Sequence, residues 1–231
     1  MSSAIEGVLK VYPNHVSLYI PKVPITERQV EKDEYNHNAG KSDSNQDFLQ
    51  KSIDRTHSRV RDYILCNDFQ WFFTLTINPD ICDRHDDSSV RKVLKSYFDN
   101  IRRHNSLEYI LVPERHKTGA LHFHGLIKTT QSLDPTGRKD RSGRKRYQCS
   151  TALRMLGWND WTEVGSKDAL SQYVRKYITK NMITDPYKKR YYVSRNLKKP
   201  EIHYFDPRDL PDGIWDSLSD IDYAYYGEVG I

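Results

Sequence analysis

The order of the elements that the sequence predicts from residue 71 onward indicates an α+β fold. A β-rich run, WFFTLTI, is followed by a stretch in which apolar residues recur at helical spacing, and then by two further short apolar runs. A second helix and a last strand follow. Strand, helix, strand, strand, helix, strand is the order of the split βαβ, or ferredoxin-like, arrangement, in which helices pack mainly on one face of an antiparallel sheet.

Each element depends on a pattern of its own. The run Trp71–Ile77 predicts a strand that ends at the turn formed by residues 78–80, Asn-Pro-Asp. Apolar residues recur at helical intervals from Val90 to Ile101, which predicts a helix capped by Ser88 or Ser89. The other predicted elements are strands at 109–112, 121–127 and 191–193, a helix over 168–180, and a further strand at 158–164.

The pattern is weaker before residue 71. A short strand is predicted within Val8–Ile20, residues 36–44 are typical of a polar linker, and residues 46–65 carry apolar side chains at helical spacing. We therefore expect three parts: an N-terminal extension with a helix (1–59), a principal domain (60–200) with a basic insert (129–147), and an acidic C-terminal tail (201–231).

The composition predicts a soluble protein without a membrane span. Charged residues make up 29% of the 231 residues and hydrophobic residues 37%, and no run of about 18 apolar residues occurs. Cys66, Cys82 and Cys149 lie far apart and form neither a disulfide framework nor a cysteine zinc site, which favours a reducing compartment.

Basic residues gather in two segments. Residues 138–146 hold six Lys or Arg against one acid, and residues 172–199 hold nine against one acid, with tyrosines interleaved. Cations beside aromatic side chains suit the phosphates and bases of nucleic acid. Residues 201–231 have the opposite sign, with eight acids against one arginine.

Two histidines, His122 and His124, alternate along a predicted strand, so their side chains share one face of the sheet. A three-residue loop over 117–119, with Gly119 at the left-handed position, would pair Glu114 of the preceding strand with His122 and place it on the same face. A two-residue loop would place Glu114 on the opposite face. Two nitrogens and a carboxylate are typical of a catalytic metal ion. Mg²⁺ or Mn²⁺ suits carboxylate and phosphate oxygens, and the imidazoles also admit zinc or nickel. The alternative is a pair of histidines hydrogen-bonded within a sheet.

The helix predicted over 168–180 carries Tyr173, Lys176, Tyr177 and Lys180 within about 100° of arc. A phenolate can attack a phosphodiester and form a covalent intermediate, and nearby cations favour ionisation of a phenol whose ordinary pKa is about 10. The alternative is two half-buried core tyrosines beside solvated lysines. An adjoining apolar stripe is expected to pack on the sheet: Leu170, Val174 and Ile178.

Three motifs in this order resemble those of the HUH endonucleases, specifically the rolling-circle replication initiators of bacteriophages and small plasmids. WFFTLTINPD is similar to the first motif, ERHKTGALHFHGLI to the second and YVRKYITK to the third. The downstream RYYVSRNLKKP is also similar to phage members. Relaxases place the tyrosine before the histidines, so they are disfavoured, whereas single-tyrosine transposases share the order. The resemblance covers about residues 60–200.

The resemblance implies a five-stranded antiparallel sheet and a metal-dependent nuclease. His122 and His124 would bind the divalent metal, Mg²⁺ or Mn²⁺, with Glu114 as the third ligand. Tyr177 or Tyr173, beside Lys176 and Lys180, would cut single-stranded origin DNA, keep the 5′-phosphate as phosphotyrosine, and leave a 3′-hydroxyl for a host polymerase. The lysine context of single-tyrosine members fits Tyr177 best.

The basic segments are expected to bind the origin DNA, including any hairpin in it. Because the chain carries no helicase domain or phosphate loop, we expect a host helicase to unwind the duplex, in the cytoplasm of a bacterial or archaeal host. The candidate DNA-binding residues are Arg138, Lys139, Arg141, Arg144, Lys145, Arg146, Lys188, Lys189, Arg190 and Arg195.

Two other functions stay open on the sequence alone. One is a non-catalytic nucleic-acid-binding module in which Trp71, Phe72 and Phe73 stack on bases. The other is a metalloenzyme that acts on small nucleotides, with the tyrosines in its core. A single-tyrosine transposase of the same superfamily is a further alternative.

Overall fold

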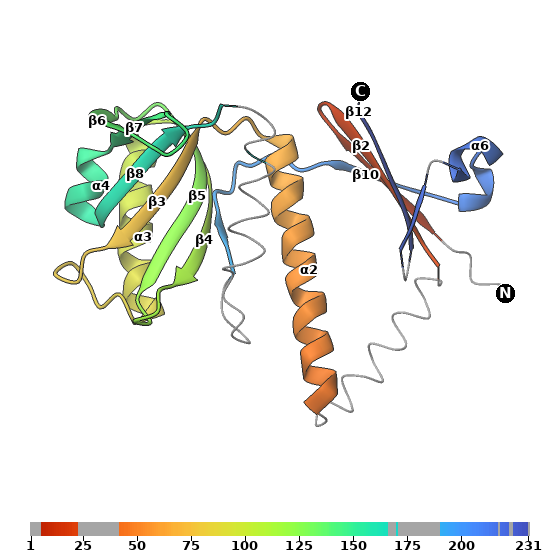
Figure 1. Cartoon of the computed structure of the whole chain (residues 1–231), viewed down its shortest axis with the longest axis horizontal. Coiled ribbons are helices and arrows are strands. Elements are labelled where there is room, and N and C mark those ends of the chain that lie inside the picture. The colour runs from red at the N-terminus through yellow and green to blue at the C-terminus, as the bar shows by residue number, and fades with distance from the viewer. Residues whose placement is uncertain are drawn as a thin grey trace. The chain divides into compact units, whose positions relative to one another are not determined.

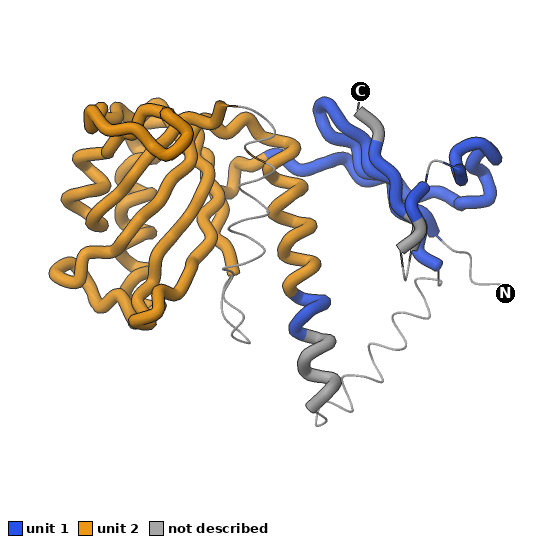
Figure 2. The backbone as a smooth tube through the Cα atoms, in the orientation of Figure 1, with its two compact units in different colours: residues 1–52, 198–231 blue, residues 53–197 orange. Residues whose placement is uncertain are grey.

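The computed structural model describes residues 6–22, 42–165, 170, 190–216, 218–221 and 224–230. It is a mixed α+β structure with two antiparallel sheets. The chain divides into two compact units, one formed by residues 1–52 and 198–231 and the other by residues 53–197 (Figure 2). Within these described ranges, no helix is long and apolar enough to cross a membrane.

The larger unit is built on a seven-stranded sheet with the strand order β6-β7-β8-β3-β5-β4-β9 (Figure 1). The prediction of five strands is wrong for this sheet, because the basic insert folds into a hairpin, β6–β7, that continues the sheet beyond β8. The strands are β3 (Trp71–Ile77), β4 (Leu107–Arg115), β5 (Leu121–Thr129), β6 (Asp134–Lys139), β7 (Lys145–Gln148), β8 (Gly157–Glu163) and β9 (Tyr192–Val193).

The strand beside β3 is β8, and not the strand at 191–193 that the sequence predicts as the last of the split βαβ order. β9 pairs instead with β4, at the far edge. The helix before β8 is α4 (Ser150–Met155). A central position needs an apolar side chain towards the core, and β8 supplies Trp161, whose ring centroid lies 4.6 Å from that of the fully buried Phe73.

Helices cover both faces of this sheet (Figure 1). α3 (Asp87–His104) and α4 pack over a core that includes Phe73 and Phe123. α2 (Ser42–Cys66), which confirms the helix predicted over 46–65, packs its Val60 against Phe72 and Leu126 on the opposite face. The prediction that helices lie mainly on one face is therefore wrong. Successive residues of the central strands are apolar on both sides, so both sides are covered.

The helix predicted around 90–101 is confirmed as α3, but its cap is Asp86 and not Ser88 or Ser89. The Asp86 carboxylate accepts hydrogen bonds from the amides of Ser88 and Ser89 at 3.1 and 3.0 Å, so one side chain satisfies two of the unpaired donors at the helix start. A further bond from the Ser89 hydroxyl, together with these two amides, lowers the pKa of the Asp86 carboxyl.

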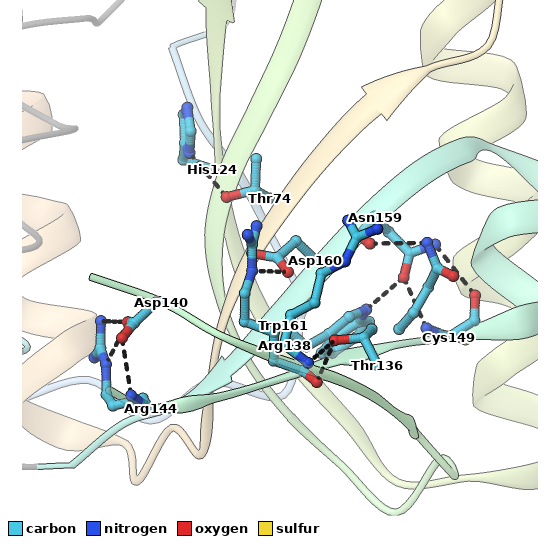
Figure 3. A network of polar contacts seen from close by, with 12 residues as sticks. Thr74, His124, Thr136, Arg138, Asp140, Arg144, Cys149, Asn159, Asp160 and Trp161 are labelled. Carbon is cyan, nitrogen blue, oxygen red and sulfur yellow. Dashed lines mark hydrogen bonds and ion pairs between the residues drawn. The ribbon is translucent and has the colours of Figure 1, made fainter. Parts of the chain in front are cut away.

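The start of β8 depends on Gly157. Its φ is 130°, and a Cβ there would lie 2.5 Å from backbone atoms of both Thr76 and Asn78. This close approach allows the Asn78 amide to donate to Leu156 O at 2.9 Å. Two residues further on, the fully buried Asn159 accepts hydrogen bonds from the Cys149 amide and the indole of Trp161, both at 2.8 Å, which ties β8 to the start of α4 (Figure 3).

The smaller unit is a five-stranded antiparallel sheet built from both ends of the chain, with the order β10-β1-β2-β12-β11. The short strand predicted within Val8–Ile20 is a hairpin of two strands, and the segment predicted as an acidic tail supplies the other three. The elements are β1 (Gly7–Tyr12), β2 (His15–Pro21), β10 (Glu201–Phe205), η2 (Pro207–Asp209), α6 (Asp212–Trp215), β11 (Ser219–Ile221) and β12 (Ala224–Gly230).

Candidate active site

The two histidines lie on a hairpin whose register the sequence predicts correctly. Residues 117–119 link β4 to β5, and Gly119 has a φ of 84°. In this register Glu114 stands directly opposite His122, so its side chain lies on the face that His122 and His124 share. The three-residue loop is thereby confirmed. We call this side of the seven-stranded sheet the histidine face; it is the side that α2 covers.

A threonine of β3 holds each histidine ring. Thr76 Oγ1 lies 3.1 Å from Nδ1 of His122, and Thr74 Oγ1 lies 3.3 Å from Nδ1 of His124 (Figure 3). With Nδ1 engaged in this way, Nε2 is the nitrogen through which each imidazole can meet a ligand, and the ring orientation is set.

Glu114 completes the group from the neighbouring strand. Its Oε2 lies 2.8 Å from Nε2 of the half-buried His124. Two imidazoles and a carboxylate thus stand on adjacent strands, beside the two threonines of β3, with their backbones held by continuous ladder pairing. A rigid sheet is a precise support for such a group, because the register fixes which side chains meet.

The pKa of His122 lies below its ordinary value. Partial burial is the main cause, and the neighbouring His116, whose ring centroid is 5.3 Å away, lowers the pKa further. Glu114 acts in the opposite direction. The neutral imidazole is therefore favoured at His122, and it is the form that binds a metal ion.

The donor set suits a divalent cation that is also bound by phosphate oxygens. In the ranges that the structure describes, no three His, Cys, Asp or Glu side chains stand in a ready arrangement around one metal position. The hydrogen bond between Glu114 and His124 accounts for part of this, because it takes up the nitrogen and oxygen that a metal would use. Metal binding would exchange that hydrogen bond for coordination by both groups.

The predicted nucleophile segment lies almost wholly outside the described residues. Tyr173, Lys176, Tyr177 and Lys180 all fall in 171–189. Leu170 is the single described residue of 166–189; it is helical and packs against the apolar cluster of the histidine face, as the predicted stripe requires.

The basic insert presents its cations in two ways. Arg144 and Arg146 form short ion pairs inside the protein, Arg144 to Asp140 at 2.7 Å and Arg146 to Asp160 at 2.7 Å (Figure 3). Hydrogen bonding and the charge of Asp160 raise the pKa of Arg146. The other four side chains of the β6–β7 hairpin are exposed: Arg138, Lys139, Arg141 and Lys145.

Of the second basic segment, the structure describes Arg190, which is half-buried, and Arg195, which is exposed. Lys188 and Lys189 lie outside the described residues. Of these four candidates for DNA binding, Arg195 is the one that the described part of the chain shows on the surface.

Sequence reasoning missed the two threonines. The signal is present in WFFTLTI, where Thr74 and Thr76 alternate in an otherwise apolar strand and so share one face. Sequence reasoning also proposed stacking by Phe72 and Phe73 in its alternative module. That proposal is wrong for both rings, since Phe73 is fully buried under α3 and Phe72 is buried in the opposite cluster.

Comparison with known proteins agrees with the motifs and the geometry. Residues 70–182, which include the histidine strand, its partner strands and the predicted tyrosine helix, match the family model of the Replication-associated protein ORF2. A search of curated proteins and a search of solved structures found no match to the chain. On the strength of its residues 70–182, the chain belongs to this replication-associated protein family, a family of rolling-circle replication initiators.

Proposed function

We propose that the protein initiates rolling-circle replication by nicking and rejoining single-stranded origin DNA through a tyrosine, with the help of a divalent metal. The observation that carries this proposal is the group formed by Glu114, His122 and His124 on one face of the sheet, with both imidazoles oriented through Nδ1. Family membership supplies the replication context. The strand order β8-β3-β5-β4 also agrees with a ferredoxin-like domain.

His122, His124 and Glu114 are the residues that would hold the metal. Bound there, Mg²⁺ or Mn²⁺ would polarise the scissile phosphate and offset its developing negative charge. Thr74 and Thr76 keep the rings turned so that Nε2 faces the ligand, a positioning role that outer residues commonly play around metals.

A tyrosine of the segment 171–189 acts as the nucleophile in this proposal. Its phenolate oxygen bonds to phosphorus while the bond from phosphorus to the 3′-oxygen breaks. The 5′-phosphate then stays on the tyrosine, and the 3′-oxygen takes a proton to become the hydroxyl that a polymerase extends. Attack by a 3′-hydroxyl on the phosphotyrosine reverses the bonding and joins the ends. Leu170 packs on the histidine face, which supports a helix starting on the side where the metal ligands lie.

Incubation of the full chain with labelled single-stranded DNA and Mn²⁺, followed by denaturation, tests the proposal. We expect a covalent protein–DNA adduct that needs the metal and is lost in chelator. Binding without an adduct would instead favour the non-catalytic module, and hydrolysis of free nucleotides alone would favour the small-nucleotide enzyme. The probe DNA should carry the replication origin of the element that encodes the protein.

A second expected result concerns the four exposed cations of the β6–β7 hairpin. Replacing Arg138 and Lys145 by glutamine should flatten the dependence of DNA affinity on salt by roughly 0.7 log units per decade for each lost phosphate contact. Affinity titrations over a range of salt concentrations measure the slope. Arg91 and Lys92, which are exposed on α3, provide the matched control pair and should leave the slope unchanged. An equal slope in the hairpin variant would make the hairpin an ordinary solvated surface.

A further inference from the structure

Trp158 stands out among the aromatic side chains of the larger unit. Its side chain is 45% exposed, whereas Trp161, three residues later on the same strand, is fully buried. A single exposed aromatic residue is common on protein surfaces and is not in itself a site. What distinguishes Trp158 is its place in the sheet.

The strand register puts Trp158 in one row with the candidate metal ligands. On β8 it is the direct partner of Thr76, Thr76 is the direct partner of His122, and His122 is the direct partner of Glu114. Directly paired residues project to the same face, so Trp158 lies on the histidine face. Since neighbouring strands are about 4.8 Å apart, the backbone of Trp158 is roughly 10 Å from that of His122.

The surroundings of Trp158 agree with this orientation. Asn159, its neighbour in sequence, points to the opposite side, where it bonds to Cys149 at the start of α4. Asp160, two residues beyond Trp158, is the direct partner of Thr74 on the histidine face and holds Arg146 in an ion pair (Figure 3). The indole thus lies between the candidate metal group and the basic β6–β7 hairpin, on a strand anchored from both sides.

We infer that Trp158 is a nucleobase-binding subsite, on which a base of single-stranded DNA stacks next to the phosphate to be cut. The inference rests on the proposed function, and it adds the residue that positions the substrate. An aromatic ring binds any base through its π-face, and the hairpin cations can meet the backbone of the same strand. A base held at this distance would fix the neighbouring phosphate over the histidine pair.

The test compares two probes that differ only in their bases: oligodeoxythymidylate and a fully abasic oligomer of the same length. Both carry the same phosphates, so the ratio of their affinities, measured in chelator, isolates the contribution of the bases. We expect Trp158→Ala to weaken oligodeoxythymidylate binding roughly 5- to 100-fold and to leave abasic binding nearly unchanged. Trp158→Phe, which keeps an aromatic ring, should retain most of the preference for bases.

Leu153→Ala is the matched control, because Leu153 is also 45% exposed but lies on α4, which packs on the other face of the sheet. It should leave both affinities unchanged. Intrinsic fluorescence adds a second measurement: oligodeoxythymidylate should quench the wild type more than Trp158→Phe. The same change with both probes in Trp158→Ala, or an unchanged ratio, would overturn the subsite.

The outcome separates this inference from the proposed function. A wild type that forms the metal-dependent adduct while Trp158→Ala keeps its preference for bases would overturn the subsite and leave the nicking function in place. A base preference that depends on Trp158, in a protein that forms no adduct, would support the subsite and contradict nicking.

Discussion

Replacement of His122 by alanine is expected to abolish formation of the covalent protein–DNA adduct. The variant removes one of two imidazoles that stand with Glu114 on the histidine face, and with it a nitrogen that would hold the metal. A metal that stabilises the developing charge contributes several kcal/mol to the transition state, so we expect a loss of roughly three orders of magnitude or more in the rate. The measurement is adduct formation with time, over a series of Mn²⁺ concentrations.

DNA affinity should survive the same change, because single-stranded DNA is bound largely through its phosphates. His104→Ala, at the exposed end of α3, is the matched control and should cleave as the wild type does. Thr76→Val tests the positioning of the ring without touching its ligand nitrogen. We expect it to raise the metal concentration needed for half-maximal activity roughly 10- to 100-fold. Undiminished cleavage by His122→Ala, or cleavage in chelator, would contradict the metal role.

Tyr177→Phe is expected to eliminate the first covalent adduct, whereas Tyr173→Phe should leave initial nicking intact and impair the second transfer that ends a round. Tyr177 lies between Lys176 and Lys180 in sequence and, on the predicted helix, within one turn of each. Tyr173 is near Lys176 only. Two neighbouring cations favour the phenolate more than one does, so Tyr177 should ionise and attack first.

Trapping the adduct, digesting the protein and mapping the modified peptide decides between the two phenols. The two side chains lie about 6 Å apart along the predicted helix axis, so one metal group could be reached by both in turn. The Tyr173→Phe variant serves as the control for Tyr177→Phe, because each removes a single hydroxyl from the same stripe. Initial adducts on Tyr173 alone would reverse the assignment. Adducts on neither would return both residues to the core.

The local patterns of the sequence determined much of the larger unit. The strand at 71–77 has the predicted bounds, and the helix around 90–101 and the hairpin between Glu114 and His122 are confirmed. These predictions succeeded because each depends on residues close together in the chain: alternation within one strand, helical spacing within one helix, and a glycine that fixes one loop. A short loop leaves little freedom of register, so the sequence alone placed Glu114 on the histidine face.

Only the tertiary structure decided how distant segments pair. β1 pairs with β10, almost two hundred residues away, and nothing in either strand specifies its partner. Likewise, the basic insert becomes two more strands because β7 pairs with β8, which no local pattern requires. The row from Trp158 to Glu114 is also non-local, since it crosses three strand pairings. The alternation of residues along a strand is encoded in sequence, but the neighbour of each strand is chosen by the packing of the whole sheet.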